Sequence, residues 1–369
     1  MAEFDYEELV KATQSFSPSK LIGKGSHGSV YEGNLSENRV VAIKRSSINI
    51  GVESQQRDNL KKLDNEISIL SSLRESSNII SFLGTATNDS AKSNDKLLVM
   101  ELMPNGSLHD LLHVAATPPP WPKRVEIAMQ IARAVQFLHE GNPLVIHRDI
   151  KSANILFDVS WIAKLADFGL AISPGEDSSS QTSTVQPAGT IGYLDPCYTA
   201  PNKLSTKNDV FSLGVVFLEI ISGRKVIDVS KAPASIVEWA IPLVEKQRIV
   251  EVCDPRVPFP TYMEGMIRRI LSVASRCLSE NEERRPSIGE IIMEMESYNS
   301  IERVRSYNIT AWASLLQSLI LITRKRRKLT SQQWRRAKTH QAAAGDHIVN
   351  SDVSRRKTML VKEILLADV

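Results

Sequence analysis

The chain has 369 residues, a length that predicts two or three domains at roughly 150 residues each. Hydrophobic residues make up 42% and charged residues 24%, which suits a soluble globular protein and excludes collagen-like and low-complexity classes. Three widely spaced cysteines (Cys197, Cys253 and Cys277) are too few for a disulfide framework or a four-cysteine zinc site, and they favour a reducing compartment.

The formal net charge of +3 is unevenly distributed along the chain. Residues 301–369 carry 14 Lys and Arg against five Asp and Glu, so a basic tail follows a mildly acidic body. The acidic start lacks the apolar stretch of a signal peptide, and Ala2 excludes N-myristoylation. No apolar run reaches the roughly 18 residues that a membrane span needs, so we expect no transmembrane segment.

The first hundred residues are predicted to be rich in strands, because short apolar runs alternate with turns. Apolar residues at helical spacing also predict two helices in this part. The expected elements are a helix over 4–15, a glycine-rich stretch over 21–33, a strand over 40–45, a helix over 58–73, and a hairpin of strands over 79–83 and 97–102.

The remainder is predicted to be mainly helical. Residues 125–139 carry an apolar face with 3.6-residue periodicity, and the almost wholly apolar residues 210–221 suit a buried central helix. Weaker helices are expected over 236–247, 264–278 and 287–297, with a loop over 173–188. A strand-rich front and a helical body predict two lobes joined by a hinge near 101–106.

A glycine-rich motif opens the strand-rich part. Gly23, Gly25 and Gly28 fit the pattern G-x-G-x-x-G, in which the missing Cβ atoms let the backbone approach phosphates. A dinucleotide-binding fingerprint has the same glycines, but it needs a helix directly after them. Here a returning strand and then Val41-Ala42-Ile43-Lys44 follow, which is typical of the phosphate cover of kinases.

A lysine on a buried strand needs a partner, because an unpaired ammonium out of water is costly. ATP phosphates and a carboxylate of the next helix could both serve. Glu66 is the favoured carboxylate because it lies mid-helix, while Asp64 and Glu53 compete and Glu53 is expected to precede the helix. The alternative is that Glu66 is an ordinary exposed helix residue.

Two further motifs complete a set of four. His147-Arg148-Asp149 with Asn154 fits H-R-D-x-x-x-x-N, and Asp167-Phe168-Gly169 fits D-F-G. With all four in order, the chain resembles a eukaryotic protein kinase over residues 17–297. The resemblance implies an α+β, bilobal fold with a five-stranded sheet. Its implied parts are a helical extension over 1–16, an N-lobe over 17–100, a hinge over 101–106 and a C-lobe over 107–297.

The resemblance also implies roles for polar residues. Lys44 holds the α- and β-phosphates and pairs with Glu66, while Asp149 accepts or orients the substrate hydroxyl proton and Lys151 adds charge at the γ-phosphate. Asn154 and Asp167 are the implied ligands of Mg²⁺, or of Mn²⁺. The alternative for each is a solvated loop charge.

The nucleotide contacts implied by the resemblance lie around the hinge and the glycine-rich motif. Met100 takes the gatekeeper position, and backbone groups of Glu101 and Met103 bond adenine. The ring is held between Leu21, Val30, Ala42 and Leu156, which could equally be core residues. The other implied ATP-binding residues are Ile22, Gly23, Lys24, Gly25, Ser26, His27, Gly28 and Ser29.

Three segments indicate a subgroup within the protein kinases. The sequences at 103–108, 189–196 and 208–225 resemble plant receptor-like kinases, which are related to Pelle, and most of all a receptor-like cytoplasmic kinase near the CRINKLY4-related group. The implied activity is that of a non-specific serine/threonine protein kinase, which transfers the γ-phosphoryl of MgATP to protein hydroxyls. Implied partners are protein substrates and a membrane receptor kinase. The alternative is a signalling pseudokinase or scaffold.

The segment before Gly189 predicts regulation by phosphorylation, with Thr184 first and Thr182 second as acceptors and Arg148 as the phosphate-binding partner. A merely soluble loop is the alternative. By resemblance, Thr190 lies against Asp149 and Lys151 and favours Ser/Thr substrates.

One position departs from the family. A glutamate is expected after Asp195-Pro196, where it pairs with a buried arginine, here Arg285, but this chain has Cys197. Breaking such a pair can cost about 3–5 kcal/mol unless another acid or water substitutes.

The tail over 298–369 combines an amphipathic helix with basic clusters. Trp312, Leu315 and Leu319 recur at helical spacing, and Arg324 to Lys328 are all basic. The expected location is cytoplasmic, with the tail packed or disordered. Alternatives are nuclear localisation and weak attachment to the anionic inner face of the plasma membrane. Direct nucleic acid binding is not expected, because no recognition fold accompanies the charge.

Overall fold

A computed structural model describes residues 2–25, 28–36, 39–46, 53–88, 95–174, 186–200 and 203–297, all within one compact unit. The expectations for Ser26, His27, Thr182, Thr184 and the basic tail lie outside these residues. Among the residues described, no helix is both long and apolar enough to cross a membrane.

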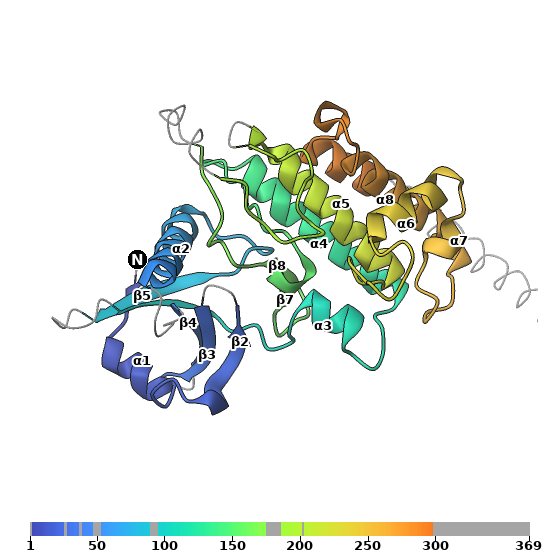
Figure 1. The fold of residues 1–369 in the computed structure, drawn as a ribbon. Helices are drawn as coiled ribbons and strands as arrows, with labels where there is room; N and C mark the ends of the chain where they lie inside the picture. Colours follow the sequence, from blue (N-terminus) through green and yellow to red (C-terminus); the bar gives the residue numbers. More distant parts are fainter. Residues whose placement is uncertain are drawn as a thin grey trace, which may run out of the picture. The chain divides into compact units, whose positions relative to one another are not determined.

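The N-lobe is built on one mixed sheet (Figure 1). Its strand order is β1-β5-β6-β4-β3-β2. It has six strands where the sequence predicted five, because residues at the extreme N-terminus add β1 parallel to β5. The strands are β1 (Ala2–Glu3), β2 (Leu21–Lys24), β3 (Gly28–Asn34), β4 (Val40–Ser46), β5 (Phe82–Asn88) and β6 (Asp95–Glu101).

Gly84 makes room for the added strand. It pairs with Ala2 at a φ of +158°, and a Cβ there would lie 2.1 Å from the Ala2 carbonyl oxygen. A residue with a side chain at position 84 would therefore push β1 away. A pattern of apolar residues cannot predict β1, because the strand has two residues and both are exposed.

The two faces of the sheet have separate cores, because successive side chains of a strand point to opposite faces. On β4, Val41 and Ile43 join the cluster that covers α1 (Tyr6–Ala12), while Ala42 between them joins the larger cluster with α2 (Glu53–Ser72). Leu9 of α1 is fully buried in the first cluster. The N-terminal helix is thus part of the packing of the N-lobe.

Two element boundaries differ from prediction. Helix α2 begins at Glu53, so Glu53 lies inside it and does not precede it. The second strand of the predicted hairpin is close to β6, but β5 begins only at Phe82 and runs on through polar residues. Ile79 and Ile80 are buried before the strand begins, where Ile79 bridges to Leu165. Hydrophobicity alone does not distinguish these two uses of an apolar run.

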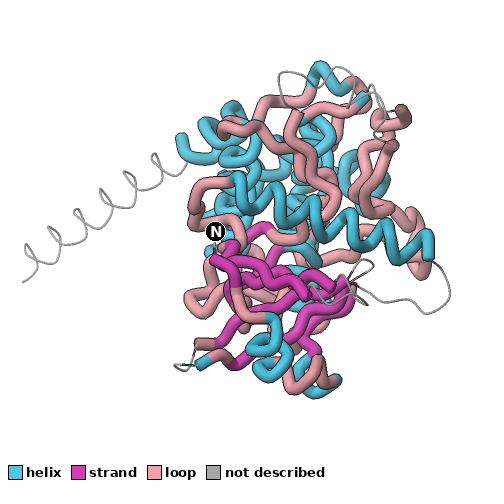
Figure 2. The backbone as a smooth tube through the Cα atoms, turned by 90° about the vertical axis from the view of Figure 1, so that its left-hand side faces the viewer, coloured by secondary structure: helices cyan, strands magenta, loops and turns pink. Residues whose placement is uncertain are grey.

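The C-lobe is mainly helical (Figures 1 and 2). Helix α5 is buried along almost its whole length, since every residue from Asn208 to Ser222 is buried. A capping box of Ser205 and Asn208 begins α5, and Gly223 in the left-handed conformation ends it. The elements are α3 (Leu108–His113), α4 (Trp121–His139), β7 (Ile155–Phe157), β8 (Ala163–Leu165), α5 (Thr206–Ser222), α6 (Ile236–Glu245), α7 (Ile249–Val252), α8 (Glu264–Cys277) and a helix over 288–297.

We predict that Leu9→Ala lowers the free energy of unfolding by about 2–5 kcal/mol, because a fully buried leucine leaves a cavity between α1 and the sheet. Urea unfolding of the two proteins measures the change. Lys11→Ala on the exposed side of the same helix is the control and should alter stability by about 0.5 kcal/mol or less. Equal effects of the two substitutions would show that α1 does not contribute to the folded N-lobe.

Candidate active site

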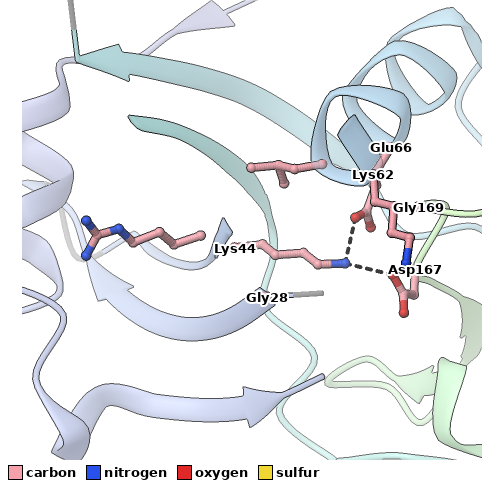
Figure 3. Close-up of a pocket in the computed structure, with 8 residues that line it drawn as sticks. Gly28, Lys44, Lys62, Glu66, Asp167 and Gly169 are labelled. Carbon is pink, nitrogen blue, oxygen red and sulfur yellow. Dashed lines mark hydrogen bonds and ion pairs between the residues drawn. The ribbon is translucent and has the colours of Figure 1, made fainter. Parts of the chain in front are cut away.

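Lys44 of β4 lies between two carboxylates from different parts of the chain (Figure 3). Its Nζ donates to Glu66 Oε2 of α2 at 2.6 Å and to Asp167 Oδ1 at 2.7 Å. Glu66 is only 1% exposed, so it is not the ordinary surface residue of the alternative interpretation. Burial alone would lower the pKa of Lys44, but the carboxylates of Glu66 and Asp167 raise it above its ordinary value. The ammonium is therefore charged and links strand, helix and D-F-G segment.

The D-F-G segment is held from both sides. The Phe168 ring is fully buried and packs edge-on against His147 at a centroid distance of 4.7 Å. Burial lowers the pKa of His147, so its ring is neutral at pH 7. Asn65 of α2 donates from Nδ2 to the carbonyl oxygens of Phe168, Gly169 and Ala171. The sequence did not single out Asn65, although its position beside Glu66 was a usable signal.

Three predicted polar side chains, Asp149, Lys151 and Thr190, lie in contact with one another. Lys151 Nζ donates to Asp149 Oδ2 at 2.7 Å and to Thr190 Oγ1 at 2.9 Å. Thr190 Oγ1 in turn donates to Asp149 Oδ1 at 2.6 Å. A carboxylate, an ammonium and a hydroxyl are thus in mutual contact, from segments 41 residues apart. This arrangement can orient a hydroxyl and accept its proton.

Asp209, near the start of α5, holds the backbone just before Asp149. Its two carboxylate oxygens accept from the backbone N–H groups of His147 and Arg148 at 2.8 Å each, and His139 bonds the same carboxylate at 2.9 Å. Arg148 has a φ of +67°, a conformation that costs a non-glycine residue about 1–3 kcal/mol. The buried carboxylate stabilises that conformation. No sequence motif pointed to this role of Asp209.

Arg148 contacts described residues before and after the stretch that was predicted to be phosphorylated. Its Nη2 donates to the Gln186 carbonyl oxygen at 2.6 Å and to the Tyr198 hydroxyl at 3.1 Å, and Nη1 donates to the Leu170 carbonyl oxygen. Nε is buried and has no hydrogen-bond acceptor among the residues that the structure describes. The guanidinium of Arg148 therefore lies directly beside the backbone at residue 186.

The residues expected around a nucleotide base fall into two groups. Ala42 and Met100 belong to the buried hydrophobic cluster that joins the sheet to the C-lobe, and the partly buried Val30, Met103 and Leu156 pack against it. Leu21 and Ile22 lie at the surface, 38% and 49% exposed. At the end of the glycine-rich motif, the backbones of β3 and β4 also lie close together.

Around that motif the other expected contacts are spread along β2 and β3. Gly23 is half-buried and Lys24 and Gly25 are exposed, while Gly28 is buried and Ser29 half-buried. A Cβ on Gly28 would lie 2.7 Å from the Arg45 carbonyl oxygen, so only glycine allows the close approach of β3 and β4. At the hinge, Lys164 holds the carboxylate of Glu101 at 2.7 Å.

The expected metal ligands are of the correct chemical type. Asn154 Nδ2 donates to Asp149 Oδ2 at 3.1 Å, so its amide oxygen is the atom suited to a cation. The Asn154 carbonyl oxygen accepts from the N–H of Ala166, next to Asp167. Asp167 is a carboxylate that is 29% exposed at its side chain. Hard oxygen donors of this kind fit a divalent cation such as Mg²⁺.

The missing glutamate at position 197 has a substitute. Arg285 is fully buried, and its Nη1 and Nη2 donate to the two oxygens of Asp195 at 2.5 and 2.9 Å. Nε donates to the Ser279 carbonyl oxygen, and Nη2 also contacts Cys197 Sγ at 3.4 Å. Asp195 thus supplies the acid, two residues earlier than expected. The charge of Arg285 is paired without Glu at position 197.

The fold and these contacts define a protein kinase, and the comparison of sequences agrees: the protein kinase domain family matches residues 16–295. The chain belongs to this family, and the proteins it is similar to include plant receptor-like kinases. The predicted α+β bilobal fold and family resemblance are therefore confirmed.

Several Arabidopsis thaliana proteins are similar to the chain. A serine/threonine-protein kinase-like protein is 49% identical over 342 residues, which cover 89% of this chain and 96% of the relative. The kinase-like protein CCR4 and the proline-rich receptor-like protein kinase PERK10 are each 38% identical. In both cases 80% of this chain aligns, with 40% and 38% of the relative.

We predict that Asp195→Asn lowers the free energy of unfolding by about 3–5 kcal/mol, because it leaves a buried guanidinium without a counter-charge. Chemical denaturation measures the change. Cys197→Ser is the matched control, since its sulfur makes one weak contact with the same arginine, and about 1 kcal/mol or less should be lost. If the cysteine substitution were the more damaging, Asp195 would not be the partner that stabilises Arg285.

Proposed function

We propose that the protein is an active ATP-dependent serine/threonine protein kinase that transfers the γ-phosphoryl group of MgATP to protein hydroxyls. The contact of Asp149 with both Lys151 and Thr190 carries the proposal, because it combines a proton acceptor, a cation and a bound hydroxyl. The ion pairs of Lys44 with Glu66 and Asp167 support it.

Each residue has a distinct part in this proposal. A substrate hydroxyl would take the place that Thr190 Oγ1 has at Asp149 Oδ1, so that the carboxylate orients it and receives its proton. Lys151 would stabilise the negative charge that gathers near the transferred group, and Lys44 would hold the phosphates. Asn154 and Asp167 would hold Mg²⁺, which supplies charge neutralisation of the phosphates when bound.

The rival proposal is a pseudokinase or scaffold that binds partners without turnover. Its specific support is Cys197, which replaces a charged residue of the family. That support is weakened by the bidentate pair of Asp195 with Arg285, which supplies the missing charge. Recruitment by a membrane receptor kinase, and a place in cytoplasmic signalling, belong to the first proposal and rest on the family resemblance.

We predict that purified protein with labelled ATP and Mg²⁺ incorporates phosphate on Ser or Thr, and that Asp149→Asn abolishes this because the amide cannot accept the proton. Asp64→Asn is the control: it makes the same change in an exposed carboxylate paired with Lys96, and activity should stay within about twofold. Phosphoamino-acid analysis identifies the acceptor.

Cys197→Glu distinguishes the two proposals in the same assay. A silent wild-type protein that Cys197→Glu activates would show that the cysteine has inactivated the chain. Silence of both proteins would favour the scaffold.

We also propose that phosphorylation at Thr184, or next at Thr182, activates the enzyme by binding Arg148, whose guanidinium lies beside Gln186. Peptide mapping of the active protein should find phosphate at one of these threonines, and Thr184→Ala should lower the rate. An active enzyme without phosphate between residues 173 and 190 would contradict the proposal.

A further inference from the structure

Three side chains of types that bind metals meet where α3 packs near α5, and none of them is a predicted Mg²⁺ ligand. His109 and His113 are one helical turn apart on α3, with ring centroids 4.9 Å apart, and Glu219 projects from α5. One ligand atom from each residue can be chosen so that all lie within 4.8 Å of one another. Histidines at i and i+4 on one helix face are a known arrangement for binding zinc.

Glu219 is a buried acid that forms no ion pair with a lysine or arginine among the residues described. Its side chain is 1% exposed, and its oxygens accept from His113 Nε2 at 2.7 Å, Ser152 Oγ at 2.8 Å and Tyr193 OH at 2.7 Å. Burial and the Glu219 carboxylate raise the pKa of Tyr193, so the phenol stays protonated and donates. Buried carboxylates are ordinarily paired with a cation or bound to a metal.

We propose that His109, His113 and Glu219 form a binding site for a divalent transition metal of the zinc class. Two imidazoles and one carboxylate are a ligand set that zinc takes together with a water molecule. His109 is only half-buried and leaves an approach for the ion, whereas His113 and Glu219 form the enclosed side. No position of this site coincides with Asn154 or Asp167.

The surroundings of Glu219 resemble the outer shell of a metal centre. Ser152 and Tyr193 each donate a hydrogen bond to the carboxylate and orient it, as outer-shell residues do at zinc sites. Ser152 follows Lys151 directly, and the N–H of Tyr193 donates to the Thr190 carbonyl oxygen at 3.0 Å. A metal bound here would therefore tie α3 and α5 to the two segments that hold the catalytic contacts.

The competing explanation is that His113 and Glu219 are only a structural hydrogen-bonded pair. The two explanations differ at His109. This residue makes a ring contact with His113 and has no part in the hydrogen bond of the pair, so a structural pair does not need it. A metal site does.

The test uses metal-stripped full-length protein titrated with Co²⁺ and then with Zn²⁺ as competitor. We expect one equivalent of Co²⁺ with visible absorption, displaced by Zn²⁺, and a rise in Tm of about 5 °C at a hundredfold excess of Zn²⁺ over its Kd. His109→Ala should weaken Zn²⁺ binding by at least the roughly 10–100-fold typical of losing an outer-shell partner, and should remove the rise in Tm.

Two further variants keep the result decisive. Glu219→Gln preserves shape but removes the charge and should also lose Co²⁺ absorption, while His340→Ala removes a histidine of the C-terminal tail and should bind as wild type. Equal binding by wild type and His109→Ala, or a cysteine-to-cobalt charge-transfer band, would place the metal elsewhere and overturn the proposal. No absorption and no change in Tm for the wild type would leave only the structural pair.

Discussion

The contact of Lys44 with Glu66 and Asp167 is the interaction on which the arrangement of the site depends. It joins β4, α2 and the segment after β8, three parts of the chain that share no local sequence. Burial of a lone ammonium at this position would be unfavourable, so the lysine requires both acids nearby. Asn65, one position before Glu66, then bonds the backbone of the same segment. One turn of α2 therefore sets the position of both the Lys44 ammonium and the segment that begins at Asp167.

Helix α5 has the corresponding part in the C-lobe. Because residues 208–222 of this helix are all buried, their polar side chains must be satisfied within the protein, and three of them hold segments near the candidate site. Asp209 holds the backbone at His147 and Arg148, Ser212 donates to the Tyr193 carbonyl oxygen, and Glu219 binds Ser152 and Tyr193. The apolar surface of the helix positions these groups, and their hydrogen bonds hold the neighbouring segments in place.

Local motifs predicted much of the fold and of the site because they carry chemistry that needs fixed residue types. The glycine-rich pattern, Lys44 and the H-R-D and D-F-G segments belong to that class. Residues that act through long-range packing were not predictable in the same way. Nothing near Asp209 in sequence indicates that its carboxylate would meet a backbone 61 residues away. Strand β1 has no apolar pattern at all, and its place depends on the space left by Gly84.

The substitution at position 197 shows how a buried charge restricts what a chain can change. A guanidinium with no exposure needs an acid, but the acid can come from any nearby backbone position that reaches it. Asp195 is two residues away, and its carboxylate also accepts from Asn208 Nδ2 at 2.7 Å and the Cys197 N–H at 2.8 Å. The same carboxylate thus neutralises Arg285 and fixes the turn that carries Cys197. Loss of the glutamate is therefore compatible with a folded segment around position 197, because Asp195, which stands just before the lost glutamate in the expected motif, keeps Arg285 in an ion pair.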